Sequence, residues 1–150
     1  MTLNFAGTIA ILEDCEARIA AMRLSLREVV PSETSIFITD RAPRMVAWLE
    51  GHLAHVALIS LDHDLPLGSQ WGIGEYGHGR IVVDYLAALP PMCPVIIHSS
   101  NEAAASGMYY ALEWAGWPVS RVVPYDGENW IRQTWIEQIQ KYIRDGWLAR

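Results

Sequence analysis

Acidic, histidine and hydroxyl side chains in this sequence gather directly after short apolar runs. The residues concerned are Glu13 and Asp14, then Asp40, then Asp62, His63 and Asp64, then His98, Ser99 and Ser100. Carboxylates placed close together repel one another and raise each other's pKa unless a cation neutralises them. Hard oxygen ligands of this type suit Mg²⁺ or Mn²⁺. We therefore expect Glu13, Asp14 and Asp62 to hold one of these divalent ions.

A purely structural interpretation competes with the metal hypothesis. Asp residues often end strands, as loop residues and helix caps. For Asp40 this interpretation is favoured, because Arg41 follows it as a ready partner. For the set as a whole the metal hypothesis is favoured.

The apolar runs must be neighbouring strands if these side chains are to meet. Five such runs, over 9–12, 36–39, 56–61, 95–97 and 119–123, alternate with five segments of helical periodicity. The helices are expected over 17–30, 42–50 and 81–89, then up to Gly116, and over 130–144. Because the strands are unbroken β-branched runs, they indicate a doubly wound α/β fold with a parallel sheet covered on both faces. Ligands bind such sheets beyond the carboxyl ends of the strands.

Composition excludes several classes of protein. The 150 residues suit one domain, expected to span 1–150, and the 51% of hydrophobic residues exclude a disordered chain. A net charge of -6 without a basic cluster argues against binding duplex DNA. The apolar runs are too short for a membrane span and the first residues lack a basic region, so a soluble cytoplasmic protein is expected. Cys15 and Cys93 lack the C-x-x-C spacing of a zinc knuckle, and they are expected to be reduced core thiols.

The layout resembles the receiver domain of two-component signalling over essentially the whole chain. Glu13 and Asp14 stand as the acidic pair after the first strand, Asp62 ends the third, and Pro66 follows at the usual spacing. Ser99 stands where receivers carry the hydroxyl that contacts the phosphoryl group. The resemblance implies a flavodoxin-like, five-stranded parallel sheet in the order 2-1-3-4-5 with helices on both faces.

One receiver residue is missing. Val123 stands ahead of Pro124, where receivers carry an invariant Lys. Without that cation the phosphoryl oxygens lose a counter-charge, which argues against the usual phosphorylation switch. The loss leaves open a non-catalytic degenerate receiver that acts as a binding or dimerisation module.

Two segments are similar to the signatures of a more specific family. Residues 60–65 read S-L-D-H-D-L and residues 97–101 read I-H-S-S-N. They look like the D-H-D-L and H-S-x-N motifs of the cyclic-phosphate processing receiver-like family. The resemblance implies a metal-dependent phosphoesterase acting on a cyclic phosphate of a nucleotide, an RNA end or a nucleotide-derived metabolite. The stretch after D-H-D-L is longer here than in typical members, which leaves the substrate open.

Opening a cyclic phosphodiester needs a nucleophile, neutralised phosphate oxygens and a proton for the leaving oxygen. His63 or His98 is expected to move the proton, because imidazole titrates near neutral pH, and Asp64 to orient a water or a His. If Ser99 points at the site, the twofold alternation of a strand sends His98 elsewhere, unless the strand has already ended. His63 is therefore the first choice.

Phosphate binding is expected from Ser99, Ser100 and Asn101, which open a helix whose free N–H groups favour an anion. For Ser100 and Asn101, a plain helix-capping role is the alternative. Trp71 or Tyr76, in the glycine-rich stretch 65–79, is expected to stack on a base or cover the phosphate, with an irregular surface loop as the alternative. The G-x-G-x-x-G match at 72–77 starts too far beyond the strand for a dinucleotide fingerprint.

Tryptophan is concentrated in the last part of the chain. Five of the seven lie there, namely Trp114, Trp117, Trp130, Trp135 and Trp147. Trp is frequent at interfaces, so a homodimer through this C-terminal third is a candidate. Helices packed on a sheet account for most of these residues without a partner.

Overall fold

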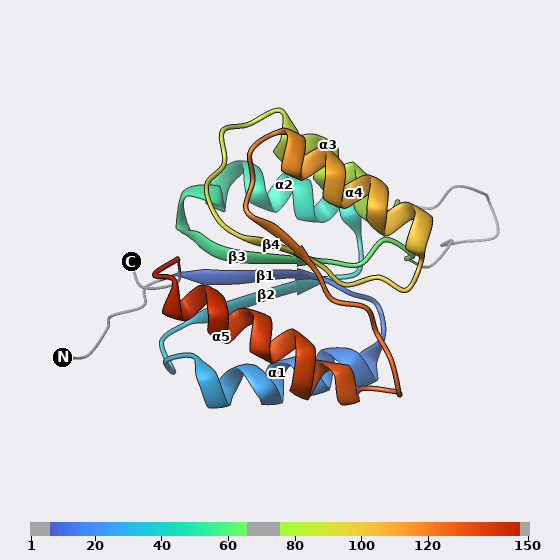
Figure 1. The fold of residues 1–150 in the computed structure, drawn as a ribbon. Coiled ribbons are helices and arrows are strands. Elements are labelled where there is room, and N and C mark those ends of the chain that lie inside the picture. The colour runs from blue at the N-terminus through green and yellow to red at the C-terminus, as the bar shows by residue number, and fades with distance from the viewer. Residues whose placement is uncertain (1–6, 66–75, 148–150) are drawn as a thin grey trace.

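A computed structural model describes residues 7–65 and 76–147 of the chain. Its sheet has five parallel strands in the order β2-β1-β3-β4-β5, which confirms the predicted order (Figure 1). The strands are β1 Thr8–Leu12, β2 Ser35–Thr39, β3 Val56–Leu61, β4 Val95–Ile97 and β5 Val119–Arg121. Pro66, Trp71 and most of the G-x-G-x-x-G stretch lie outside the described residues.

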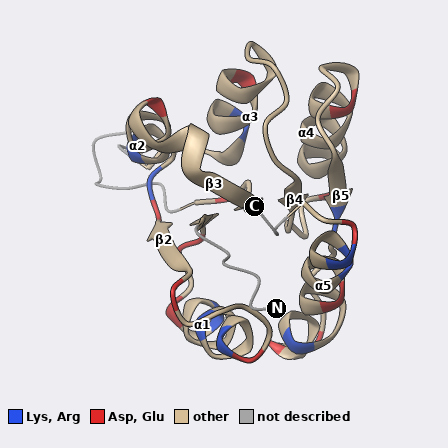
Figure 2. Ribbon diagram, turned by 90° about the vertical axis from the view of Figure 1, so that its left-hand side faces the viewer, with Lys and Arg blue, Asp and Glu red and all other residues tan. Residues whose placement is uncertain are grey.

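The helices form a layer on each face of the sheet. They are α1 Glu16–Val29, α2 Ala42–His52, α3 Gly79–Ala87, α4 Glu102–Trp114 and α5 Ile136–Arg144. Helices α1 and α5 cover one face, and α2, α3 and α4 cover the other (Figures 1 and 2). A 3₁₀ turn over Leu53–His55 follows α2, and a π-helical segment over Ile131–Trp135 leads into α5.

Two predicted boundaries differ from the structure near the C-terminus. The fifth strand ends at Arg121 rather than at residue 123. After it, the amide of Val122 donates to the carbonyl of Ile97 at 2.9 Å, and Pro124 has no N–H with which to continue the ladder. The fifth helix is not α-helical throughout, because its first turns are wound as a π-helix.

Alternation along the strands divides the core in two. In β1, Ile9 and Ile11 pack with α1 and α5, whereas Ala10 and Leu12 pack with α2, α3 and α4. All four are fully buried, and each buried Ile or Leu side chain contributes about 1.5–3 kcal/mol of hydrophobic stabilisation. Both faces therefore hold the sheet rigidly, and the carboxyl ends of its strands are fixed relative to one another.

Helix α3 approaches the end of β3 very closely at Gly79. The Gly79 amide donates to the carbonyl of His63 at 3.0 Å. A Cβ atom at Gly79 would lie only 2.0 Å from the carbonyl oxygen of Asp62. Glycine is required here because no side chain fits between the helix and the strand end.

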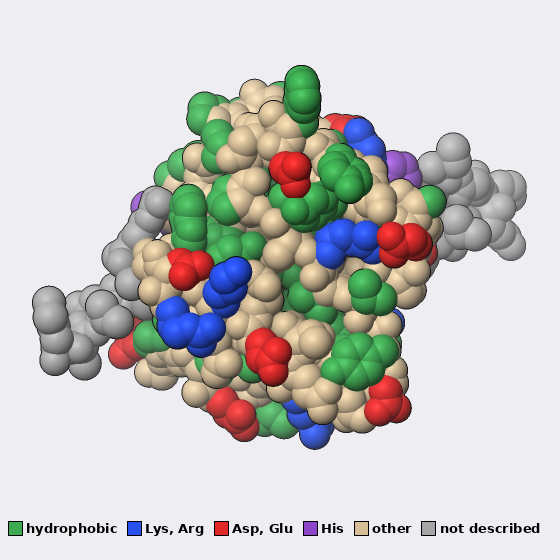
Figure 3. Space-filling model, in the orientation of Figure 1, with side chains coloured by type: hydrophobic (Ala, Val, Ile, Leu, Met, Phe, Trp, Pro, Cys, Tyr) green, Lys and Arg blue, Asp and Glu red, His purple; other side chains and the backbone are tan. Residues whose placement is uncertain are grey.

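The C-terminal tryptophans are mostly part of the core. Trp117, Trp130 and Trp135 are buried, whereas Trp114 on α4 is 94% exposed. Figure 3 shows hydrophobic side chains over the α4 and β5 region, with charged side chains between them. The homodimer stays a prediction. None of the helices within 7–65 and 76–147 is both long and apolar enough to cross a membrane.

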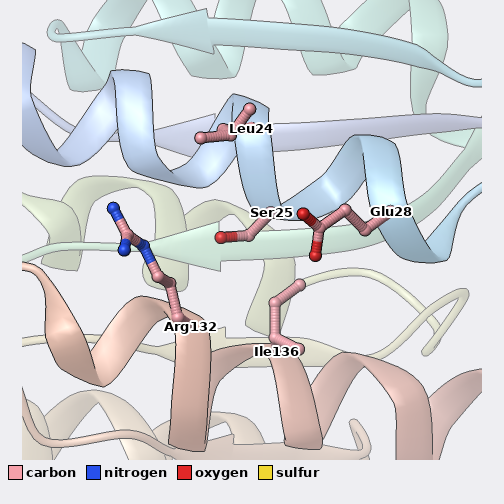
Figure 4. A pocket seen from close by; sticks show the side chains of 5 residues that line it. All are labelled: Leu24, Ser25, Glu28, Arg132 and Ile136. Atoms are coloured by element: carbon pink, nitrogen blue, oxygen red, sulfur yellow. The ribbon is translucent and has the colours of Figure 1, made fainter.

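A small pocket of about 210 Å³ lies between α1 and the segment that leads into α5 (Figure 4). Its lining residues are Leu24, Ser25, Glu28, Arg132 and Ile136. None of them stands at the carboxyl end of a strand, so this pocket is separate from the residues that the sequence singles out for chemistry.

Candidate functional site

The ends of three adjacent strands bring Glu13, Asp62 and His98 together. Each stands two residues beyond a strand residue that faces α1 and α5, namely Ile11, Ser60 and Ile96. Because side chains alternate along a strand, the three project toward the same face. One ligand atom from each lies within 4.8 Å of the others. All three side chains are buried, so they form a group that could hold a metal ion.

The contact between Glu13 and His98 leaves one atom of each side chain without a hydrogen bond. Oε1 of Glu13 lies 3.2 Å from Nε2 of His98, yet neither atom has a hydrogen bond to any residue that the structure describes. An unpaired polar atom in the interior costs about 1–3 kcal/mol. A separation near 3 Å suits neighbouring ligands of one ion with bonds of about 2.1 Å. The donor set therefore fits a divalent cation.

The other oxygen of Glu13 is fixed by the backbone. Oε2 accepts the amides of Asp14 at 2.9 Å and Cys15 at 3.1 Å. These amides precede the first turn of α1, where unpaired N–H groups favour a negative charge. The bonds orient the carboxylate so that Oε1 is directed toward the group.

A hydrogen-bonded chain supports His98 from behind. Its Nδ1 lies 2.6 Å from Oγ of Ser60, which in turn accepts Nε1–H of Trp135 at 3.0 Å. Ser60, His98 and Trp135 are all buried. The chain fixes the ring so that Nε2 faces Glu13.

Arg18, which the sequence analysis did not single out, supplies a cation at the group. Its Nη1 lies 3.5 Å from Oε1 of Glu13 and 3.9 Å from Oδ2 of Asp62. Its guanidinium also lies over the ring of Trp130, 5.5 Å from the centroid. A cation in the first turn of a helix opposes the helix dipole. That position in the sequence was a signal that Arg18 needs an acidic partner.

The carboxyl groups differ in how readily they ionise. Burial raises the pKa of Glu13, but the His98 ring, the Cys15 amide and Arg18 outweigh burial and lower it to about 2. Burial, and after it the Glu13 carboxylate, raise the pKa of Asp14 to about 6. Burial also raises the pKa of Asp62. The group thus concentrates negative charge beside Arg18, which favours a bound cation.

His63 and Asp64 form a second pair beside the buried group. Nδ1 of His63 lies 2.8 Å from Oδ1 of Asp64, and Nδ2 of Asn101 donates to the same oxygen at 3.2 Å. These bonds, the one from His63 first, lower the pKa of Asp64. The His63 ring stacks on His78 with centroids 5.2 Å apart. Asp64 is thereby placed to orient the His63 imidazole.

The hydroxyl segment leads into α4. Ser99 is buried and its Oγ accepts the amide of Asn101 at 3.1 Å. Asn101 is the N-cap of α4, where its Oδ1 accepts the amide of Ala104 at 3.2 Å. Ser100 is exposed. Asn101 therefore caps α4, and the same side chain also holds Asp64.

The structure distributes the predicted residues over two adjoining groups. Glu13 and Asp62 meet as expected, but the third member of the buried group is His98 and not Asp14. Asp14 lines a neighbouring pocket of about 280 Å³ together with Asp40 and Arg44. Strand alternation does not separate His98 from Glu13 and Asp62, because β4 ends at Ile97 and the His98 ring lies with these carboxylates on the face covered by α1 and α5.

The position of the missing receiver Lys is apolar and open to solvent. Val123 is 50% exposed. Arg121, two residues earlier, is paired through both terminal nitrogens with Glu102, at 2.9 and 2.8 Å. The cation at the end of the fifth strand is therefore Arg121, which is paired with Glu102 of α4, and residue 123 carries no charge.

Residues 11–114, well over half of the chain, match a family described as the cyclic-phosphate processing receiver domain. Among solved structures, the phosphorylated cyanobacterial phytochrome response regulator RcpA is 17% identical with a TM-score of 0.68, covering 91% of this chain and 92% of that one. The Mn(2+)-bound form of response regulator Rcp1 is 17% identical with a TM-score of 0.64, covering 95% and 94%. The response regulator domain of Thermotoga maritima CheB is 14% identical with a TM-score of 0.65, covering 95% and 96%.

No curated protein sequence matches the chain. At identities this low the solved structures show the receiver fold and nothing more. The family match is more specific, because it spans both motif segments, D-H-D-L and H-S-S-N, whose side chains form the two adjoining groups together with Glu13. The chain belongs to the cyclic-phosphate processing receiver domain family.

Proposed function

We propose that this protein is a metal-dependent phosphoesterase that opens or removes a cyclic phosphate on a nucleotide, an RNA end or a nucleotide-derived metabolite. The observation that carries the proposal is the buried group of Glu13, Asp62 and His98 at the strand ends. Two of its ligand atoms face each other without a hydrogen bond. The family to which the chain belongs supports the cyclic-phosphate substrate.

Glu13, Asp62 and His98 would hold the ion, through carboxylate oxygens and Nε2, and Asp14 adds a carboxylate at the adjoining pocket. When bound, a divalent cation neutralises charge on phosphate oxygens and lowers the pKa of a bound water. Mg²⁺ or Mn²⁺ suits a site with two or three carboxylates. The Mn(2+)-bound form of Rcp1, which shares the fold, agrees with this choice.

Proton transfer falls to His63 in this proposal. His98 is fully buried with Nε2 directed at Glu13, so it serves as a ligand rather than as a proton carrier. The His63 side chain is 21% exposed and its Nδ1 is bonded to Asp64. That bond leaves Nε2 of His63 to exchange a proton with the leaving oxygen or with the attacking water.

The phosphate group would sit at the start of α4. The hydroxyl of Ser99, the backbone at Ser100 and the first amides of α4 stand at this helix start, which Asn101 joins to Asp64, and such amides favour an anion. Asn101 keeps Asp64 and the helix start together. Trp71 stays a proposed contact for the rest of the substrate.

A non-catalytic degenerate receiver is the second candidate. The observation that favours it is the exposed Val123 at the position of the receiver Lys. This candidate predicts that Asp62→Asn keeps the function of the protein. The phosphoesterase predicts that metal binding and turnover are lost together.

The deciding experiment is hydrolysis of a panel of 2′,3′-cyclic nucleotides, cyclic-phosphate-ended oligonucleotides and ADP-ribose cyclic phosphate. Each substrate is tested with Mg²⁺, with Mn²⁺ and with chelator, for the wild type and for Asp62→Asn. Asp84→Asn is the matched control, because Asp84 is an exposed carboxylate paired with Arg80 on α3. We expect metal-dependent turnover that Asp62→Asn abolishes and Asp84→Asn retains. No turnover on any substrate, with no divalent ion bound in calorimetry, would favour the degenerate receiver.

A further inference from the structure

We propose that Arg18 is the cation of this site that binds the phosphate group. Without a divalent ion, Arg18 is paired with Glu13 and Asp62, and a bound ion displaces it from these carboxylates. The proposal rests on the proposed function, since it assigns the residue of the same site that recognises the phosphate group. Three observations support it: the position of the guanidinium, the charges around it and the pairing of Arg121, the cation of the fifth strand, with Glu102.

Arg18 contacts the atoms that a metal would use. Its Nη1 is 3.5 Å from Oε1 of Glu13, the same oxygen that faces Nε2 of His98. It is also 3.9 Å from Oδ2 of Asp62. A guanidinium and a divalent ion therefore compete for these two carboxylates. When the ion binds, Arg18 loses its partners and must find another anion.

The guanidinium is placed to make that exchange without a large movement. The Arg18 side chain is 26% exposed, whereas its two acidic partners are 0% and 7% exposed. Its charge thus lies between the buried group and the solvent from which a phosphate arrives. The ring of Trp130 lies under it, fully buried and also stacked against His98. A rigid aromatic platform keeps an arginine oriented by a cation–π contact.

The charge balance favours the same role. Fully ionised, the carboxylates of Glu13 and Asp62 carry two negative charges, which a divalent ion cancels. The Arg18 guanidinium then leaves one positive charge, which the single negative charge of a cyclic phosphodiester balances. Without Arg18 the charge of the phosphate would stay unbalanced. An arginine also suits phosphate in geometry, because its planar fork donates two hydrogen bonds to two oxygens.

The fifth strand provides no unpaired cation that could bind the phosphate in place of Arg18. Receivers place a Lys where this chain has Val123, and Arg121 is held by both oxygens of Glu102. Arg18 comes from α1 on the other side of the buried group, where its guanidinium already touches Asp62. The counter-charge of the site is thus supplied from α1 instead of from β5.

The first test is metal affinity without phosphate. Mn²⁺ is titrated calorimetrically into the wild type, Arg18→Met and the control Arg23→Met, which removes an exposed arginine of the same helix. Because Arg18 competes with the ion, we expect Arg18→Met to bind Mn²⁺ about threefold to tenfold more tightly. Arg23→Met should bind it like the wild type. Unchanged or weaker binding by Arg18→Met overturns the proposal.

The second test is phosphate affinity with Mn²⁺ at saturation. Inorganic phosphate is the probe, followed by equilibrium dialysis. We expect Arg18→Met to bind it about tenfold more weakly than the wild type, and Arg18→Lys to recover part of the loss. Equal phosphate binding by the wild type and Arg18→Met overturns the proposal even if Mn²⁺ binds more tightly. Should Arg18→Met fail to fold, Arg18→Gln carries the same two expectations.

Neither measurement needs turnover, so the two proposals fail separately. A wild type without hydrolytic activity would contradict the proposed phosphoesterase function. The two binding measurements on Arg18→Met could still be interpreted. A purely structural Arg18 would lower the thermal stability of Arg18→Met in chelator and would not move metal and phosphate affinity in opposite directions. Opposite shifts in Arg18→Met that Arg23→Met does not show would mean that the Arg18 guanidinium acts on both ions at this site.

Discussion

The hydroxyl of Ser60 lies 2.6 Å from Nδ1 of His98 and at the same time accepts Nε1–H of Trp135 at 3.0 Å. A serine hydroxyl can accept a hydrogen bond from Nδ1–H or donate one to an unprotonated Nδ1. When Ser60 accepts from Nδ1–H, the lone pair of Nε2 is free on the side of Glu13. In this tautomer Ser60 supports the ring state that a metal ligand needs, as the partners of metal-bound histidines commonly do.

Ser60→Ala is expected to weaken Mn²⁺ binding about tenfold. The variant removes the partner of Nδ1 and leaves Nε1 of buried Trp135 without its acceptor, so a loss of about 1–2 kcal/mol in the free energy of unfolding accompanies it. Calorimetric titration measures the affinity, with Ser32→Ala, at an exposed turn residue, as the control. Wild-type affinity in Ser60→Ala would mean that the ring is oriented by packing against Trp130 alone.

Metal binding is expected to stabilise the fold. An ion at 100 times its dissociation constant adds about 2.7 kcal/mol to the free energy of unfolding, which raises the melting temperature of a domain of this size by roughly 5–10 °C. Thermal unfolding of the wild type with Mn²⁺ and with chelator measures the difference. Glu13→Gln should show none, because it loses a charged ligand at the centre of the group. A stabilisation of equal size in Glu13→Gln would place the ion elsewhere.

Much of this arrangement could be read from the sequence, because it follows from periodicity. Unbroken apolar runs ending in polar residues predicted the parallel sheet and the shared edge where Glu13 and Asp62 meet, whereas the strand order was implied by the resemblance to receivers. The D-H-D-L and H-S-S-N segments predicted the family. These signals are local or repeat at fixed spacing, so they can be recognised in the sequence without the structure.

Other features depend on contacts between distant elements and could not be read in this way. The direction of His98 depends on which face of the sheet the buried group occupies. Ser60 and Trp135 are 75 positions apart and meet only through the packing of α5. Arg18 is visible in the sequence only as a cation in an unfavourable helix position. Its partners Glu13 and Asp62 are determined by how α1 packs against the sheet.

The charge of Asp14 is expected to cost stability in the metal-free protein. Burial and the Glu13 carboxylate raise the pKa of Asp14 from 3.8 to about 6. Between these values the folded chain keeps a proton that the unfolded chain has lost, so stability falls as pH rises through this range. Asp14→Asn removes the effect. In chelator it should exceed the wild type by about 1 kcal/mol above pH 6, less than the full shift implies because the carboxyl is partly solvated.

Denaturant unfolding at several pH values measures this difference. The advantage of Asp14→Asn should be absent below about pH 4 and grow until about pH 6. With saturating Mn²⁺ it should shrink or reverse, because the ion stabilises the ionised carboxyl. An advantage that stays constant with pH would point to packing at Asp14 rather than to its charge.

Gly79→Ala is expected to destabilise the fold by about 2–4 kcal/mol. The new Cβ would lie 2.0 Å from the carbonyl oxygen of Asp62, which is backbone and has no room to give. Gly51→Ala is the matched control, because Gly51 lies in α2 with nothing within 4 Å of the added atom. There, alanine should stabilise by about 0.5–1 kcal/mol. Denaturant unfolding of both variants measures the contrast, and a neutral Gly79→Ala would show that α3 can move away from Asp62.

Asp64→Asn is expected to separate catalysis from stability. Asp64 is exposed, and ion pairs at the surface contribute little to folding, so the melting temperature should stay close to that of the wild type. Its carboxylate orients His63, and losing that charge should lower kcat for the cyclic phosphate about a hundredfold with a smaller change in KM. Steady-state kinetics measures both constants, beside Asp84→Asn, which should match the wild type. Unchanged kcat in Asp64→Asn would remove His63 and Asp64 from the proposed proton transfer.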